Sequence, residues 1–108
     1  AVNRYEDFSH GAVNEARLCR MAALCRKRGI SLVLVATPLR PSYRAEQNPA
    51  QTADMLRRIE RVAARFPQTV RFLDFASDPA FTANDFYDAD HLNRAGAAKL
   101  SLKVKGAI

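Results

Sequence analysis

Two features that often reveal a function class are missing from the sequence: a long apolar run and a cysteine framework. No apolar run among the 108 residues approaches the roughly 20 that span a bilayer, so we expect no transmembrane helix in this chain. The only cysteines, Cys19 and Cys25, fall six positions apart within one helical pattern. That spacing separates them by about 9 Å along the axis and on different faces, so they cannot form a disulfide with each other. Because no histidine or cysteine lies nearby at ligand spacing, we expect packed thiols rather than a metal pair or a nucleophile.

The N-terminal segment lacks the marks of a secretion signal. Residues 1–11, AVNRYEDFSHG, have neither the charged nor the apolar part of a signal peptide. The sequence also begins without methionine, which we interpret as a processed product or a segment of something longer. Hydrophobic residues make up 48% and charged residues 26%, near the average for a globular domain. Residues 1–108 are therefore expected to form one small domain or part of one.

A formal net charge of +6 raises the question of nucleic acid. Most of the basic residues lie on two predicted helices: Arg17, Arg20, Arg26, Lys27 and Arg28 on the first, and Arg57, Arg58, Arg61 and Arg65 on the second. The second helix also carries a buried stripe at three/four spacing, formed by Leu56, Ile59, Ala63 and Phe66. Its arginines are therefore expected on the opposite, solvated face. Since no RNP-like aromatic motif, zinc-finger spacing or helix-turn-helix accompanies the charge, nucleic acid is not expected as a partner. Binding of an anionic polymer by the arginine faces is an alternative, and its affinity for the chain would fall steeply as the salt concentration rises.

Periodicity and turn signals predict alternating helices and strands. The predicted elements are, in order, a helix over 12–28, an apolar strand over 30–36, a proline-framed loop over 37–48, a helix to about Arg65, a strand over 70–75 and a helix over 94–105. Small residues form the expected inner side of the first helix: Ala12, Ala16, Cys19 and Ala23. The second helix is expected to begin with Asn48 as its cap, Pro49 in its first turn and Gln51 at the capping-box position.

This order of elements predicts an α/β fold with a parallel sheet and helices on its faces, because a strand, helix, strand connection is normally right-handed and parallel. The strand ISLVLVA, Ile30 to Ala36, is apolar enough to be covered on both faces and paired on both edges. Only one other strand is predicted, so the sheet looks incomplete. Residues 2–8 could add a strand, another chain could pair with the edge through self-association, or upstream strands of a larger domain could complete the sheet.

A histidine between aspartates follows the second strand. Asp88 and His91 lie in a loop beyond the carboxyl end of that strand, the edge where α/β sheets assemble ligand sites. At this spacing Asp88 can accept the Nδ1 proton of His91 and leave Nε2 free as a base, although Asp90 competes for the same proton. Asn93 and Gly96 are expected to start the last helix and to let it pack closely. A loop histidine with a structural role is one alternative. A divalent-metal loop of Asp85, Asp88, Asp90 and Asn93 is another, but its spacing misses the EF-hand pattern.

The block DADHLNRAGA, Asp88 to Ala97, preceded by the FLDF strand, resembles the closing block of the SGNH (GDSL-type) hydrolases. It is most similar to bacterial acyltransferase-like branches that modify cell-wall polymer or exopolysaccharide. The resemblance covers residues 12–108 and implies the last two strands of a three-layer α/β/α, flavodoxin-like fold. It further implies that Asp88 orients His91, that His91 activates a serine, that no cofactor or metal is needed, and that the protein acts in the bacterial cell envelope or periplasm.

The family's nucleophile and oxyanion-hole blocks have no counterpart in this sequence. Ser9 lacks the preceding strand and GDS context, and Asn84-Asp85 follows no strand of the right kind. Because losing the serine alone costs several orders of magnitude in rate, this chain by itself is expected to be nearly inert. The sequence therefore predicts the C-terminal part of an SGNH-like ester hydrolase or O-acyltransferase. The alternative is a noncatalytic α/β module that binds a protein or an anionic polymer.

Overall fold

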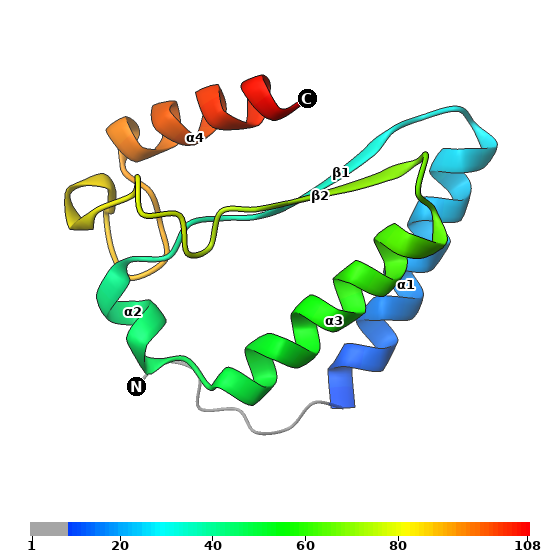
Figure 1. Ribbon diagram of the computed structural model, residues 1–108, viewed down its shortest axis with the longest axis horizontal. Coiled ribbons are helices and arrows are strands. Elements are labelled where there is room, and N and C mark those ends of the chain that lie inside the picture. The colour runs from blue at the N-terminus through cyan, green and yellow to red at the C-terminus, as the bar shows by residue number, and fades with distance from the viewer. Residues whose placement is uncertain (1–8) are drawn as a thin grey trace. The chain divides into compact units, whose positions relative to one another are not determined.

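The computed structural model describes residues 9–108 and contains the predicted alternation of helices and strands (Figure 1). Its elements are α1 (Ser9–Lys27), β1 (Leu32–Ala36), α2 (Pro41–Glu46), α3 (Pro49–Arg65), β2 (Val70–Asp74), the short 3₁₀ helix η1 (Ala83–Asp85) and α4 (Arg94–Ala107). The two strands pair in parallel, which confirms a mixed α/β chain. None of the helices in this part of the chain is long and apolar enough to cross a membrane. The strand considered over residues 2–8 lies outside the described residues.

The sheet of the described chain has two strands, β1 and β2. Within residues 9–108 each strand therefore has one partner strand, and no further strand lies beside its other edge. The sequence predicts that both faces of β1 are buried. Within residues 9–108 they are not, because the residues of β1 are at most half-buried and Val35 is 37% exposed. An apolar strand with an open edge is the pattern that the sequence predicted for an incomplete sheet.

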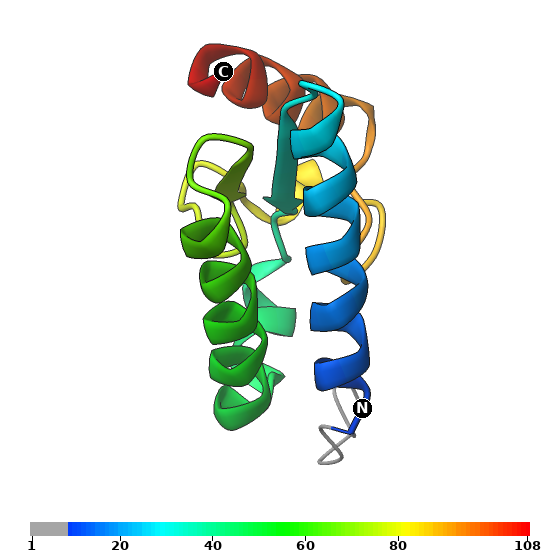
Figure 2. The same cartoon turned by 90° about the vertical axis from the view of Figure 1, so that its right-hand side faces the viewer.

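The described residues form two compact units, and the division runs through both strands. One unit comprises residues 9–34 and 48–72, and the other comprises residues 35–47 and 73–108. In the first unit α1 and α3 pack side by side (Figure 2). Its buried core consists of Ala22, Val62, Phe66 and Val70. The core thus joins one residue of α1 to the end of α3 and the start of β2.

The inner side of α1 differs from the sequence prediction. Ala22 is fully buried, whereas Ala12 and Ala16 are exposed and Cys19 and Ala23 are half-buried. Small residues lie on several sides of this helix, so their spacing alone could not identify the buried side. Cys19 and Ala23 nevertheless pack against the core as predicted, and all four predicted residues line an open groove beside α3.

Residues 41–46, predicted as part of a loop, form the short helix α2. Pro41 occupies its first position, where the fixed φ of proline suits a helix and its missing N–H is not needed. The backbone N–H groups of Tyr43 and Arg44 both donate to the carbonyl of Arg40, at 2.9 and 3.0 Å. The prolines that mark a loop in the sequence therefore also start a helix.

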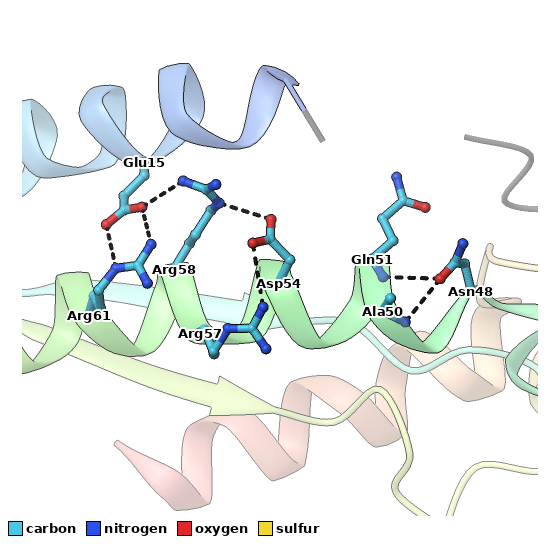
Figure 3. A network of polar contacts seen from close by, with 8 residues as sticks. All are labelled: Glu15, Asn48, Ala50, Gln51, Asp54, Arg57, Arg58 and Arg61. Carbon is cyan, nitrogen blue, oxygen red and sulfur yellow. Dashed lines mark hydrogen bonds and ion pairs between the residues drawn. The ribbon is translucent and has the colours of Figure 1, made fainter. Parts of the chain in front are cut away.

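The start of α3 confirms Asn48 as the cap. Its Oδ1 accepts from the backbone N–H groups of Ala50 at 2.9 Å and Gln51 at 3.2 Å (Figure 3). The reciprocal half of the predicted capping box does not form. Gln51 Oε1 is buried without a hydrogen-bond partner among the described residues, and its side chain extends away from Asn48 (Figure 3).

An ion-pair network joins α1 to α3 (Figure 3). The predicted solvated face of α3 is largely confirmed, because Arg57, Arg61 and Arg65 are exposed and only Arg58 is half-buried. Glu15 on α1 accepts from Arg58 Nη1 at 3.0 Å and from Arg61 Nε and Nη2 at 3.0 and 2.7 Å. Arg58 Nε also lies 2.9 Å from Asp54 Oδ2, and Arg57 Nη2 lies 3.6 Å from Asp54 Oδ1. Arg58 and Arg61 therefore hold the two helices together, whereas Arg57 pairs within α3. Local periodicity could not predict the contacts with Glu15.

The Glu15 network should make the first unit sensitive to acid. Hydrogen bonds from Arg61, then Arg58, lower the pKa of Glu15 from 4.5 to about 2. Because the folded-state pKa is depressed, the contribution of Glu15 to stability is complete above pH 4.5 and is lost as pH falls through about 2. Glu15→Gln should therefore flatten the pH dependence of the unfolding free energy in this window, as measured by urea unfolding. Glu60→Gln, a control on the exposed side of α3, should leave the slope unchanged, and an unchanged slope in Glu15→Gln would contradict the assignment.

Candidate functional site

The candidate site lies on the loop between η1 and α4, in the second unit. An antiparallel bridge between Phe86 and Leu92 closes this loop, and the N–H of Tyr87 donates to the carbonyl of His91 at 2.7 Å. Asp88 Oδ1 accepts from the backbone N–H groups of Asp90 at 3.2 Å and His91 at 2.9 Å. An aspartate side chain that satisfies backbone donors two and three residues on fixes a tight turn. The same carboxylate thus shapes the loop that carries His91.

The start of α4 anchors the end of this loop. Asn93 Oδ1 accepts from the N–H of Gly96 at 2.9 Å, and Asn93 Nδ2 donates to the carbonyl of Asn84 at 2.8 Å. A Cβ at Gly96 would overlap the carbonyl oxygen of Asp85, so glycine is required for this close approach. Both structural roles predicted for Asn93 and Gly96 are confirmed.

Lys99 on α4 provides a second anchor that the sequence did not indicate. Its Nζ lies 2.7 Å from Asp85 Oδ2 and 2.8 Å from the carbonyl of Ala80, and it sits 5.4 Å from the centroid of the buried Phe81 ring. The Lys99 hydrogen bond, followed by the backbone N–H of Thr82, lowers the pKa of Asp85 below its ordinary value. The partners of Lys99 lie 14 and 19 positions earlier in the sequence, so no short motif could predict this anchor.

Asp88, Asp90 and His91 meet at one ring nitrogen. Asp88 Oδ1 lies 2.8 Å from His91 Nδ1, as the sequence predicted, and Asp90 Oδ1 lies 2.9 Å from the same nitrogen. The His91 side chain is 71% exposed, and its Nε2 has no protein partner within residues 9–108. Carboxylates at Nδ1 stabilise the tautomer with its proton there, which leaves the lone pair of Nε2 open to solvent. The arrangement is that of an oriented, accessible base.

The two aspartates also set the charge state of the ring. The Asp88 hydrogen bond, then the charges of Asp88 and Asp90, raise the pKa of His91 above 6.5. The His91 hydrogen bond is in turn the main cause that lowers the pKa of Asp88 below 3.8. Because the folded-state pKa of His91 is raised, its pairing stabilises the fold fully below pH 6.5 and ceases to do so as pH rises through the folded value.

Asp88→Asn should lower the pKa of His91 more than Asp90→Asn does. Asp88 supplies both the largest hydrogen bond and the largest charge effect on the ring, and its Oδ1 is also held by two backbone N–H groups. Titration of the His91 ring signals by NMR measures this directly, with His10 as an internal reference. Equal shifts in the two variants would contradict the leading role of Asp88.

The same three residues also offer ligand atoms for a cation. One atom each from Asp88, Asp90 and His91 lie within 4.8 Å of one another, and all three side chains are exposed. The metal set considered from sequence is not assembled. Asp85 is paired with Lys99, and Asn93 caps α4. The distances from His91 Nδ1 to Asp88 Oδ1 and Asp90 Oδ1, 2.8 and 2.9 Å, are those of hydrogen bonds, so both carboxylates can accept from the Nδ1 proton.

Within residues 11–108, whose side chains the structure describes, the ring of His91 contacts Asp88 and Asp90 and is not hydrogen bonded to a nucleophile. The segment Asn84-Asp85, considered as an oxyanion block, has structural contacts instead: the carbonyl of Asn84 binds Asn93, and the carboxylate of Asp85 binds Lys99. This part of the chain therefore presents an exposed histidine whose Nδ1 contacts two carboxylates. Comparisons of the chain with family models, with curated proteins and with solved structures found no match.

Proposed function

We propose that this chain is the C-terminal part of an SGNH-like serine ester hydrolase or O-acyltransferase, in which His91 is the general base and Asp88 orients it. The observation that carries the proposal is the 2.8 Å contact between Asp88 Oδ1 and His91 Nδ1 beside a solvent-accessible Nε2. The proposal includes a complete three-layer, flavodoxin-like domain, to which residues outside these 108 contribute the serine, the oxyanion donors and further strands. An acylated polysaccharide or cell-wall polymer of a bacterial envelope is the proposed substrate, on the strength of the resemblance in Asp88 to Ala97.

In this mechanism the serine Oγ attacks the ester carbonyl carbon while His91 Nε2 takes its proton. The tetrahedral intermediate collapses, the carbon–oxygen bond to the alcohol breaks, and His91 returns the proton to the leaving oxygen. Water, or the hydroxyl of an acceptor sugar, then attacks the acyl-serine carbonyl carbon while His91 Nε2 takes its proton. The bond between the acyl carbon and the serine Oγ breaks, and His91 returns the proton to Oγ. Asp88 and Asp90 stabilise the imidazolium that forms in each step, because both carboxylates lie at Nδ1.

The raised pKa of His91 gives the proposed activity a pH dependence. A general base acts in its neutral form, so the rate should increase as pH rises through the His91 pKa, which lies above 6.5. The activity therefore increases with pH, whereas the stabilisation from the ion pair between His91 and Asp88 decreases with pH, because the ion pair requires the imidazolium.

A noncatalytic α/β binding or assembly module is the second candidate. It is favoured by the two-stranded sheet, because within residues 9–108 β1 and β2 each have one partner strand and an outer strand edge is a template for a strand of another chain. The sequence of the whole reading frame that contains this chain distinguishes the hydrolase from the binding module. A strand followed by a serine block supports the hydrolase, and a frame without one supports the binding module.

The activity test compares two proteins: the 108-residue chain and the product of the whole reading frame. We expect hydrolysis of p-nitrophenyl acetate by the whole product and almost none by the 108-residue chain, because the nucleophile and oxyanion donors are elsewhere. A folded whole product with no activity on short aryl esters or acylated polysaccharide would contradict the proposal.

A further inference from the structure

An arginine-lined groove runs between α1 and α3 in the first unit. Its volume is about 540 Å³, and the small side chains of α1 line it together with Arg20, Arg26, Arg58 and Arg65. Phe66 also lines the groove and is only 3% exposed, so its ring is a fixed part of the wall. The groove therefore combines an immobile aromatic surface with several long cationic side chains.

The charges in this groove are compensated at one end only. Glu15 is the single acidic residue of the lining, and its carboxylate is fully used by Arg58 and Arg61. Within residues 9–108 the three remaining arginines of the lining, Arg20, Arg26 and Arg65, have no carboxylate partner. Uncompensated arginines in a concave surface attract anions more strongly than scattered surface charges do.

Two of these arginines are held at the same ring. The Arg26 guanidinium carbon lies 4.8 Å from the Phe66 centroid and that of Arg65 lies 5.5 Å from it. Arg65 Nη1 is also 3.9 Å from Cys19 Sγ, a weak contact that directs it across to α1. Cation–π contacts restrict both side chains before any ligand arrives, so less conformational entropy is lost on binding. Two guanidinium groups beside one ring repel each other, and a doubly charged anion between them would relieve that repulsion.

From this arrangement we infer that the groove is a binding site for a phosphate dianion, free or as a phosphomonoester, held by Arg26 and Arg65 with Arg20 at its rim. The planar guanidinium fork matches the oxygens of phosphate and can bind them in pairs, which gives both charge and geometric selectivity. The site involves neither Asp88 nor His91, so it stands independently of the proposed esterase function.

Isothermal titration calorimetry of the 108-residue chain with inorganic phosphate tests the site, with ionic strength held constant by sodium chloride. The double variant Arg26→Gln/Arg65→Gln should bind phosphate at least about tenfold more weakly, because two charge-assisted contacts are lost. The matched control is Arg17→Gln/Arg57→Gln, which removes the same charge from the same two helices outside the groove. It should change the affinity by less than about twofold, since distant surface charges are screened by salt.

Equal weakening in both double variants would overturn the proposal in favour of diffuse surface charge, as would the absence of phosphate binding to the wild-type chain. Binding of a phosphodiester oligonucleotide in place of inorganic phosphate would overturn it in favour of a polymer surface. If circular dichroism shows that the groove variant is unfolded, NMR of the wild-type chain with phosphate tests the site instead. Phosphate should then shift the Nε–Hε signals of Arg26 and Arg65 and leave those of Arg17 and Arg57 in place, and the reverse pattern would refute the site.

Discussion

His91→Ala is expected to lower the rate of ester hydrolysis by the whole reading-frame product by about three orders of magnitude or more, since a serine without its base is a poor nucleophile. The His91 ring is in contact with two carboxylates, and its open Nε2 is the atom that would receive the serine proton. Initial rates of p-nitrophenyl acetate hydrolysis measure the loss in kcat/KM. His10→Ala, the other histidine of the sequence, is the control and should retain full activity.

The two aspartates extend the same test. Asp88→Asn should reduce kcat/KM by about a hundredfold or more, because it removes the carboxylate that holds the Nδ1 tautomer. Asp90→Asn should cost about tenfold or less, because Asp90 contacts the ring without the two backbone N–H groups that hold Asp88 Oδ1 in place. A His91→Ala protein with wild-type activity, or an Asp90 variant more impaired than the Asp88 variant, would contradict the assigned roles.

The largest expected effect on stability comes from Phe81→Ala. Phe81 is 1% exposed, and the Lys99 ammonium group that pairs with Asp85 lies 5.4 Å from its ring centroid. Removing a fully buried aromatic ring loses its transfer free energy and leaves a cavity, which together cost about 3–5 kcal/mol. A loss of that size is a large part of the total stability of a small domain, so the second unit should unfold at a much lower urea concentration.

Urea unfolding followed by far-UV circular dichroism measures this loss. Tyr87→Ala is the matched aromatic control, because Tyr87 is 82% exposed and its removal should change the unfolding free energy by less than about 0.5 kcal/mol. Equal losses in the two variants would show that Phe81 is not a core residue of this unit. A Phe81→Ala chain that keeps its helix content should also show weaker anchoring of α4, seen as faster amide exchange around Lys99.

The features predicted correctly from sequence are those with short-range signals. The ends of α3 follow from Asn48, Pro49 and the Phe66-Pro67 pair, and the two strands follow from apolar runs with β-branched residues. The contact between Asp88 and His91 is also local, since it spans three positions in one turn. Each of these signals is contained within a few residues, so one sequence is enough to read it.

The features that were missed depend on contacts between distant residues. The ion pairs of Arg58 and Arg61 with α1 could not be predicted, because their partner, Glu15, lies 43 and 46 positions earlier. The buried side of α1 is predicted only in part: Cys19 and Ala23 pack against the core, but alanines on several sides of the helix give no contrast that would identify Ala22. The sequence predicts a loop where α2 forms, because proline ends most helices, although at the first position of a helix it is favourable.

The central proposal is that Asp88 and His91 activate a serine. Covalent labelling of the whole reading-frame product tests this proposal most directly. A fluorophosphonate probe reacts with an activated serine, and mass spectrometry identifies the residue that carries the adduct. We predict a single adduct on a serine outside these 108 residues, formed about a hundredfold more slowly after His91→Ala. A folded protein that forms no adduct, or forms it at the same rate without His91, would contradict the role assigned to Asp88 and His91.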